Sequence, residues 1–421
     1  MEDLAERLLA GAIAAGAEAA EVFQSSSLAR PVIFEGNRLK QAETSQAEGV
    51  ALRLWRDGQP GLAVGYGPID SQTLVQKALA ISTLNAPETP NLTAGEAKDF
   101  GAVGTAVETQ QLVDWGREAI AQIRDRFPDV ICEAELSCDL EETRLINSTG
   151  LDYRAQDTAL SGYISAELTR PDDFLSAGDG RVHRHALDMS AIAGSIIQRL
   201  GWASRTVAPV TGQVPVIFTP GAAWLLWDTL RAALNAKRVA EGTSPWSQRQ
   251  GDRVIAEAIS LRQDPTAGPY SCPFDDEGVL TQPLMFVKAG VLENWYGDLA
   301  HKTTGNGIRP SLGSYPTPGL INLLVAPGHL DWQSLVAAQQ EAVIVDQVLG
   351  EGGDITGDLS ISLELGYRVT QGEIVGRVKD TMVSGNAYSA LNHLIGLGSE
   401  AEWSGSTYTP AVVVDGLSVT G

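Results

Sequence analysis

The sequence predicts an α+β fold with an N-terminal domain of helices packed on an antiparallel sheet and a C-terminal, β-rich domain with a barrel-like antiparallel sheet. Helical stripes between strand-like segments in the first half predict the N-terminal domain of helices on a sheet. Alternating apolar segments joined by glycine turns in the second half predict the β-rich C-terminal domain. At 421 residues, 43% of them hydrophobic, the chain is long enough for two cores. We place the domains at 1–208 and 209–421.

The N-terminal domain begins with an apolar stripe from Leu4 to Ile13 at helical spacing, and Gly16 is suited to end that helix. Strands are expected next at 21–26, 30–35, 49–55 and 61–65, with turns at 35–37 and 57–58. The elements predicted after them are a helix at 71–84, a loop at 86–107, a helix around 112–123, strands to about residue 168 and a helix at 187–199.

The C-terminal domain begins with an apolar strand, Val214–Phe218, and a helix within Gly221–Ala236. Strict alternation in Asp358–Leu365 predicts a strand with one buried face. Hairpin turns are predicted at Ala289–Gly290 and Gln371–Gly372. A short helix at 388–397 and a last strand at 411–414 complete the prediction.

The chain is acidic, with a formal net charge of −22 and a pI near 4.6. Such a surface repels phosphate backbones, and the densest basic run, Arg181–His185, is short. We therefore expect no direct binding to nucleic acid.

The three cysteines, Cys132, Cys138 and Cys272, are dispersed and form no Cys-x-x-Cys pair, so neither a zinc ribbon nor a disulfide framework is predicted. Cys132 and Cys138 lie six apart in a strand-like segment and are expected to be buried free thiols on one face. The acidic N-terminus does not resemble a signal peptide, and no apolar run approaches the ~20 residues that span a bilayer. These features favour a cytoplasmic protein without a membrane segment.

The apolar helix within Gly221–Ala236 carries Trp224 and Trp227 at helical spacing, which is typical of a packing helix. The alternative is that it lines a groove or a subunit contact, with Trp227 as a large interface residue. Asp228 and Arg231 are three apart and are expected to pair on one face.

Other candidate residues have both a structural and a functional interpretation. His183 and His185 could share a metal if they lie in one strand, although two ordinary surface histidines are the simpler interpretation. Asp275–Gly278 lacks the spacing of a calcium loop and predicts a tight turn. Asn306 and Arg309 lie in a polar, glycine-rich segment, where Arg309 could clamp a peptide carboxylate or serve a structural loop.

Short motifs over nearly the whole chain resemble, in order and spacing, the TldD/PmbA family, also called modulators of DNA gyrase or microcin-processing proteins. Besides the helix above, the motifs are Gly16–Val22, Glu35–Leu39, Gly49–Leu54, Gly58–Gly61, Asn147–Gly150, Asp275–Gly278, Gly305–Gly307, Arg309–Ser311, Gly350–Gly353, Ser384–Asn386 and Val414–Gly421.

In the peptidase branch of that family, the helix carries His-Glu-x-x-x-His, which binds zinc and supplies a general base. The matching positions here are Trp227, Asp228 and Ala232, and the stretch 396–403 lacks the cysteine ligand of that branch. Catalytic zinc needs about three protein ligands, which tryptophan and alanine cannot supply. The chain therefore resembles the PmbA (TldE) branch, which lacks the zinc motif.

The resemblance implies the non-zinc subunit of a cytoplasmic metallopeptidase complex that processes or degrades unfolded peptides. No cofactor is expected in this chain, and zinc is expected in a TldD-like paralogue. The partner would be that paralogue or a second copy of this chain. The residues that we expect to line the substrate or partner groove are Trp227, Asp228, Arg231, Asn306 and Arg309.

Two alternatives remain open. The chain could be a peptidase or hydrolase in its own right, with a diverged site built from His183, His185, Asp228 and Asp276. It could also be a binding protein that modulates another machine such as DNA gyrase, in which case its acidic charge would suit a basic face of that target.

Overall fold

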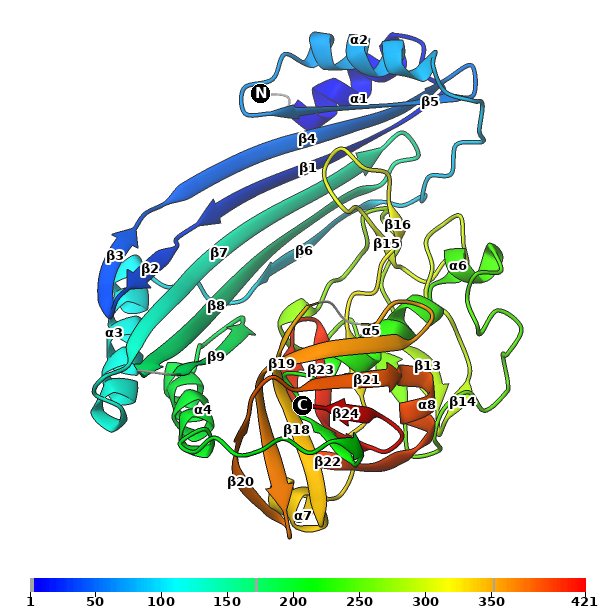
Figure 1. Cartoon of the computed structure of the whole chain (residues 1–421). Coiled ribbons are helices and arrows are strands. Elements are labelled where there is room, and N and C mark those ends of the chain that lie inside the picture. Colours follow the sequence, from blue (N-terminus) through cyan, green and yellow to red (C-terminus); the bar gives the residue numbers. More distant parts are fainter. Residues whose placement is uncertain (1–3, 171–172, 351–352) are drawn as a thin grey trace.

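The computed structural model describes residues 4–170, 173–350 and 353–421. Two large sheets dominate it: a long, curved N-terminal sheet arches over a compact C-terminal part (Figure 1). The predicted α+β class is confirmed. The predicted boundary after residue 208 lies between the last strand of the first sheet, which ends at His183, and the first strand of the second, which begins at Gly212.

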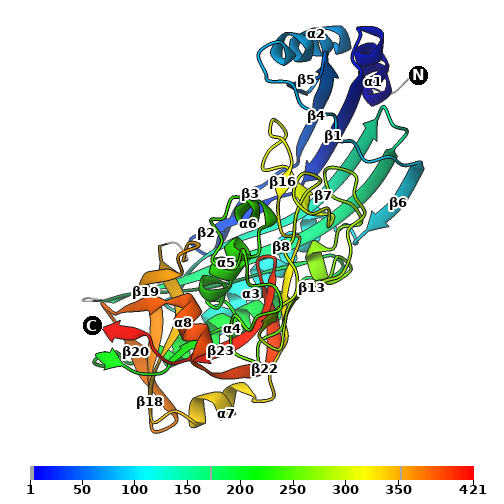
Figure 2. The same cartoon turned by 90° about the vertical axis from the view of Figure 1, so that its right-hand side faces the viewer.

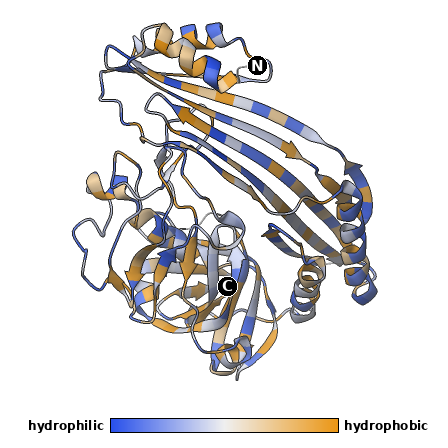
Figure 3. Cartoon of the chain, turned by 180° about the vertical axis from the view of Figure 1, so that it is seen from behind, coloured by the Kyte–Doolittle hydropathy of each residue, from blue (hydrophilic) through white to orange (hydrophobic). Residues whose placement is uncertain are grey.

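The first sheet has the order β3-β2-β7-β1-β4-β5, with β8 beside β7, and with β6 and β9 both paired to β8. Its strands are β1 (Ala19–Ala29), β2 (Val32–Glu35), β3 (Arg38–Ala42), β4 (Ser45–Arg56), β5 (Gln59–Tyr66), β6 (Ala97–Val103), β7 (Ile131–Asn147), β8 (Asp152–Arg170) and β9 (Asp173–His183). Figure 3 shows polar and apolar residues alternating along the long strands, as expected for a sheet with two different faces.

Two pairs of helices cover the ends of this sheet (Figures 1 and 2). They are α1 (Leu4–Ala14) and α2 (Ser71–Ser82) at one end, and α3 (Thr109–Arg126) and α4 (Met189–Trp202) at the other. All four were predicted, within a few residues at each boundary. The core around α3 and α4 also takes in buried residues of the second sheet, such as Ile344 and Tyr367, so the two sheets share one apolar cluster.

Three strands of the first sheet were not predicted, and for β6 the prediction of a loop over 86–107 was wrong. β6 is an exposed edge strand that pairs in parallel with β8, so its sequence shows no apolar alternation. β3 is a polar edge strand, and β9 contains glycine at alternate positions. Edge strands that bury little lack the pattern on which strand prediction depends.

The second sheet has the order β10-β24-β21-β19-β18-β11-β23-β17-β12-β13-β14, with β20 beside β19 and β22 beside β23. Its strands are β10 (Gly212–Gln213), β11 (Val216–Phe218), β12 (Leu261–Gln263), β13 (Leu284–Lys288), β14 (Val291–Leu292), β17 (Leu323–Val325), β18 (Glu341–Leu349), β19 (Asp358–Thr370), β20 (Glu373–Val378), β21 (Met382–Asn386), β22 (Leu394–Ser404), β23 (Thr407–Val414) and β24 (Ser418–Thr420). The small pair β15 (Gly307–Ile308) and β16 (Thr317–Pro318) stands apart.

The C-terminal domain is β-rich and largely antiparallel, as predicted, but its sheet, over the residues described, does not close into a barrel. In the described residues the sheet is open, and β11 pairs in parallel with β18, as β17 does with β23. Alternation along one strand predicts which face is buried but carries no information about the direction of the neighbouring strand. The predicted buried face of this strand is confirmed, since Leu359, Ile361, Leu363 and Leu365 are all buried.

The remaining helices are α5 (Trp224–Ala233), α6 (Ala236–Ala240), α7 (Trp332–Ala337), α8 (Ala387–Asn392) and the 3₁₀ turn η1 (Gly268–Tyr270). The helix predicted at 388–397 ends at Asn392, because Leu394 already belongs to β22. The predicted turns at Ala289–Gly290 and Gln371–Gly372 are confirmed.

Cys132 and Cys138 are fully buried and free, as predicted. Within the ranges that the structure describes, no helix combines the length and apolar character needed to cross a bilayer.

Candidate functional site

A groove lies where the edge of the first sheet meets the edge of the second. In the described chain β9 pairs only with β8, and β22 pairs only with β23, so both are edge strands. The cavity between them has a volume of 490 Å³, and we call it the edge groove. It is lined by 178–183 of β9, 346–348 of β18, 401–405 across the end of β22, Gly221, Ala222 and Trp224 at the start of α5, and Tyr163, Arg199 and Tyr408.

Two residues of β9 that line the edge groove, Gly178 and Gly180, are glycines. A Cβ atom at Gly178 or Gly180 would collide with the ring of Tyr163, which lies across both positions. Glycine inside a strand often marks a place where another backbone or a ligand approaches closely. Because these two positions have no side chain, the ring of Tyr163 packs directly on the backbone of β9, where Gly178 is buried and Gly180 is exposed.

The floor of the groove is held by a buried ion pair. Arg199 Nε donates to Asp346 Oδ2 over 2.9 Å, and its Nη1 donates to the carbonyl oxygen of Gly178 over 3.0 Å. Burial opposes the charge of Arg199, but the carboxylates of Asp346 and Asp179 outweigh that effect and raise the pKa of Arg199. The guanidinium therefore stays charged and ties β9 to the second sheet.

Aromatic and ionic side chains form the walls. Trp403 and Tyr408 contact each other at 5.2 Å between ring centroids, and Arg181 of β9 lies 3.7 Å from Glu402 of β22. Burial, followed by the charge of Arg181, lowers the pKa of His183 at the end of β9. A groove with an open strand edge and aromatic walls suits an extended peptide, which presents one backbone whatever its side chains.

Helix α5 leads from this groove into the core, and its two tryptophans differ. Trp224 lines the groove, whereas Trp227 is 0% exposed and its indole Nε1 donates to Thr409 Oγ1 over 2.7 Å. The expectation that Trp227 lines a groove was therefore wrong for this chain. Helical spacing placed both residues on one stripe but could not show which end of the stripe reaches the surface.

Asp228 and Arg231 form the predicted pair on α5, with 3.7 Å between Oδ1 and Nη1, and both are partly exposed. Burial raises the pKa of Asp228 although Arg231 opposes this. Across the described residues no three His, Cys, Asp or Glu side chains gather as a metal site would require. Trp227 and Ala232, which the family resemblance places at the histidine positions of the zinc motif, have no ligand atom to offer, so these residues do not fit the metal.

Asn306 is also buried, which contradicts the expectation that it lines a groove. Its Nδ2 donates to Gln263 Oε1 over 2.7 Å and to the carbonyl oxygen of Gly319 over 2.9 Å, and the residue is 0% exposed. A polar, glycine-rich segment predicts a loop but does not show whether its amide serves a ligand or the loop itself.

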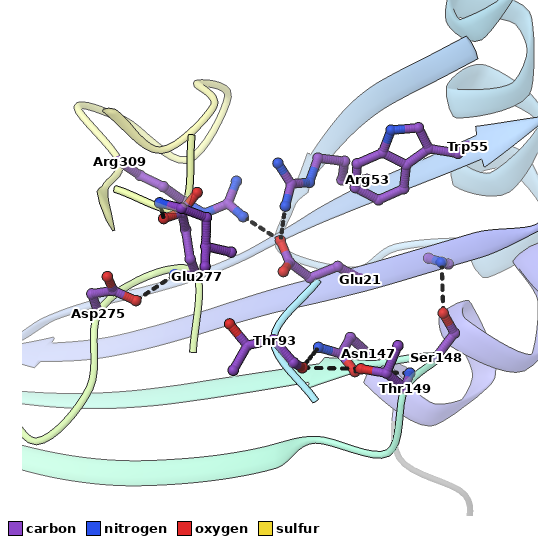
Figure 4. Close-up of polar contacts among 12 residues, drawn as sticks. Glu21, Arg53, Trp55, Thr93, Asn147, Ser148, Thr149, Asp275, Glu277 and Arg309 are labelled. Carbon is purple, nitrogen blue, oxygen red and sulfur yellow. Dashed lines mark hydrogen bonds and ion pairs between the residues drawn. The ribbon is translucent and has the colours of Figure 1, made fainter. Parts of the chain in front are cut away.

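Arg309 does bind a carboxylate, but one from this chain. Its Nη2 donates to Glu21 Oε1 over 2.7 Å, and Arg53 lies 3.3 Å from the same oxygen (Figure 4). All three side chains are more than nine-tenths buried. This cluster, which we call the interdomain ion cluster, joins β1 and β4 of the first sheet to the loop after β15.

Two cavities flank the contact between the domains next to the interdomain ion cluster. Their volumes are 420 and 480 Å³, and both are lined by Glu141, Thr143 and Asp276. The turn predicted at Asp275–Gly278 is confirmed: Asp275 Oδ1 accepts from the backbone N–H groups of Glu277 and Val279. Arg309 borders the smaller cavity.

Burial raises the pKa of Glu277 to about 7, an effect that Asp275 and Asp298 increase and that the hydrogen bond from the Leu299 N–H opposes. The Glu277 carboxyl group therefore binds its proton more tightly in the folded protein than in the unfolded chain. The stability gained from it is fully present below the unfolded pKa and is lost as the pH rises through about 7.

We therefore expect Glu277→Gln to raise the free energy of unfolding at about pH 8 by on the order of 2 kcal/mol, and to change it little at about pH 4. Urea unfolding at the two pH values measures this. The control is Glu257→Gln, an exposed partner of Arg253 that should have little effect at either pH. A gain that is equal at both pH values would contradict the assignment to the carboxyl proton.

The four residues of a diverged catalytic site lie in separate places. His183 lines the edge groove, while His185 lies beyond β9 with its Nδ1 3.2 Å from Thr105 Oγ1. Asp228 is on α5, and Asp276 borders the interdomain cavities. Of these four residues, His183 alone lines the edge groove, where Trp224 and Arg199 lie as well. The other three lie elsewhere.

Sequence reasoning missed the residues that make the edge groove, namely Gly178, Gly180, Tyr163 and Arg199. The one signal was glycine at alternate positions in 178–180, between residues of strand character. Ion pairs such as Arg199–Asp346 join positions that are distant in sequence and have no local pattern.

Comparison with known proteins places these features in a family. The model of the PmbA/TldA metallopeptidase C-terminal domain matches residues 211–421, half of the chain. The uncharacterized protein MJ0231 of Methanocaldococcus jannaschii is 25% identical over 419 residues, covering 94% of this chain and 95% of its own. The metalloprotease PmbA of Escherichia coli O157:H7 is 23% identical over 326 residues, 70% of each chain.

The fold matches that of a solved relative. The crystal structure of TldE from Thermococcus kodakarensis superposes with a TM-score of 0.89 at 20% identity and covers 100% of both chains. The match of the family model to the C-terminal half, together with these relatives, shows that the chain belongs to the TldD/PmbA family.

Proposed function

We propose that this chain is the non-zinc subunit of a cytoplasmic TldD/TldE-type peptidase complex that processes or degrades unfolded peptides. The observation that carries the proposal is the core position of Trp227, which stands where the zinc-binding branch has its first histidine. The buried indole occupies that position, and Ala232 follows where the second histidine would be. Regaining a metal site would require rebuilding the core around α5.

The edge groove supports a role in holding the peptide. An unfolded peptide can add to the edge of β9 through main-chain hydrogen bonds, which tolerate varied side chains. Trp224, Trp403 and Tyr408 provide apolar contact for side chains on one face of such a strand. In this proposal the chain supplies part of a cleft wall, and the zinc-bearing partner supplies the chemistry.

The partner in this proposal is a paralogue with His-Glu-x-x-x-His, and a second copy of this chain is the alternative. Relatives of this chain include proteins named as metalloprotease PmbA and metalloprotease TldD homologues, and one organism, Haemophilus influenzae, has both. A cell with both kinds of chain has the components of a mixed complex.

The test is to isolate the tagged chain from its own cells and identify proteins present in equal amount by mass spectrometry. We expect a paralogue that carries His-Glu-x-x-x-His. Isolation of a homodimer that binds peptide but no such paralogue would contradict the mixed complex.

A further inference from the structure

The side chain of Gln347 on β18 reaches across the edge groove to the backbone of β9. The N–H of Gly178 donates to Gln347 Oε1 over 3.3 Å, and Gln347 Nε2 donates to the carbonyl oxygen of Gly178 over 3.2 Å. One carboxamide therefore pairs with both main-chain groups of one residue.

A bulge in β18 gives Gln347 this direction. Along the pairing with β19, Val345 is opposite Gly366 and Gln347 is opposite Leu365, so Asp346 is an extra residue. A bulge changes the direction of the side chains next to it. Here Asp346 turns to Arg199, and the carboxamide of Gln347 turns to Gly178.

The contact has the form of a strand pairing. In an antiparallel sheet, a hydrogen-bonded residue exchanges both an N–H and a C=O bond with the residue opposite. A glutamine carboxamide carries the same two groups as a peptide unit. Both bonds are longer than the usual 2.9–3.0 Å for N–H donors, so they are weak ones.

Among the described residues, no side chain pairs in this way with the next outward-facing main-chain groups of β9. Along an antiparallel edge strand, alternate residues direct their N–H and C=O groups outward. Since Gly178 faces outward, Gly180 and Val182 do so too, and both line the edge groove. An extended peptide that pairs with these residues would continue onto Gly178.

We propose that Gln347 is a placeholder that occupies the position of one peptide unit and is displaced when an extended peptide adds to β9. This inference rests on the proposed function, because it concerns the same groove. Displacement replaces the two long bonds of Gln347 with those of the peptide. The affinity of the groove is thereby lowered by the bonds that must first break.

The test is the affinity of the full chain for a fluorescein-labelled, unstructured hexapeptide, Gly-Thr-Val-Ser-Thr-Gly, measured by fluorescence anisotropy. We expect Gln347→Ala to tighten binding by about 3- to 10-fold, because each broken hydrogen bond has a modest net cost. Gln347→Met should act in the same direction, since it removes both polar groups and keeps the volume. Gln333→Ala, on the exposed surface of α7, is the matched control and should change nothing.

A second peptide with alternate backbone nitrogens methylated should bind weakly to every variant, because it lacks the donors that strand addition needs. If the wild type binds the first peptide and both Gln347 variants bind it no more tightly than the wild type does, the proposal that Gln347 is a placeholder is wrong. Peptide binding in the edge groove would then still be supported. If no variant binds either peptide, or if methylation makes no difference, strand addition to β9 is wrong and the placeholder fails with it.

Discussion

Replacing Trp227 by alanine is expected to lower the free energy of unfolding by about 3–5 kcal/mol, the usual cost of deleting a large aromatic side chain from a core. Trp227 is among the largest fully buried side chains and belongs to the main C-terminal core cluster. The substitution also leaves Thr409 Oγ1 without the indole donor. Urea unfolding followed by circular dichroism measures the change.

Trp224→Ala is the matched control, because the same residue type on the same helix is only partly buried and lines the edge groove. Its loss should be less than half as large, while its effect on peptide binding should be the greater of the two. Equal losses of stability for the two variants would contradict the assignment of Trp227 to the core and Trp224 to the groove.

Removal of Glu21 is the second large effect. Glu21→Ala is expected to lower the free energy of unfolding by about 3–5 kcal/mol, because it leaves Arg53 and Arg309 buried beside each other without their shared carboxylate. The same variant should loosen the contact between the domains, since Arg309 comes from the C-terminal part and Glu21 from β1. Limited proteolysis under native conditions would detect that loosening.

Two further variants separate charge from shape. Glu21→Gln keeps an acceptor in nearly the same place but removes the negative charge, so we expect most of the loss to remain. Glu35→Ala removes a carboxylate whose ion pair with Lys40 is exposed, and it should change stability by less than about 1 kcal/mol. A loss for Glu21→Ala no larger than that for Glu35→Ala would contradict the interdomain ion cluster as a stabilising contact.

Local sequence patterns predicted the elements that bury a regular face. The apolar stripe of α3, with Leu112 and Ile123 at helical spacing, and the alternating residues of β19 each point one side to a core. The tight turns were predictable for a different reason: Asp57 and Gly58 both have positive φ angles, which these residue types tolerate better than others. Local sequence therefore predicts an element where its residue types follow from a buried face or from a required backbone angle.

The edges and the long-range contacts were not predictable in this way. β6 and β3 bury little, so nothing in their composition distinguishes them from loops. Arg309 was expected to bind a carboxylate, but Glu21 lies 288 positions away, and no local pattern joins the two. The same holds for Gln347 and Gly178, 169 positions apart, whose pairing depends on how two sheets meet.

The absence of zinc ligands on α5 could be predicted from the sequence, but the burial of Trp227 could not. The resemblance to the family implies that Trp227 and Ala232 stand where histidines occur in the peptidase branch. Only the structure shows that the indole of Trp227 is sealed in the core and bonded to β23. The proposal of a non-zinc subunit therefore gains a physical basis from packing as well as from the missing ligands.

Metal content, measured together with peptide turnover, shows whether this chain holds the peptide while another chain provides the metal. The purified chain alone should contain no stoichiometric zinc and should not hydrolyse the hexapeptide. The complex with the co-purified paralogue should contain zinc and hydrolyse it, and Trp224→Ala in this chain should slow that turnover. Stoichiometric zinc and peptide hydrolysis by this chain alone would contradict its role as the non-zinc subunit.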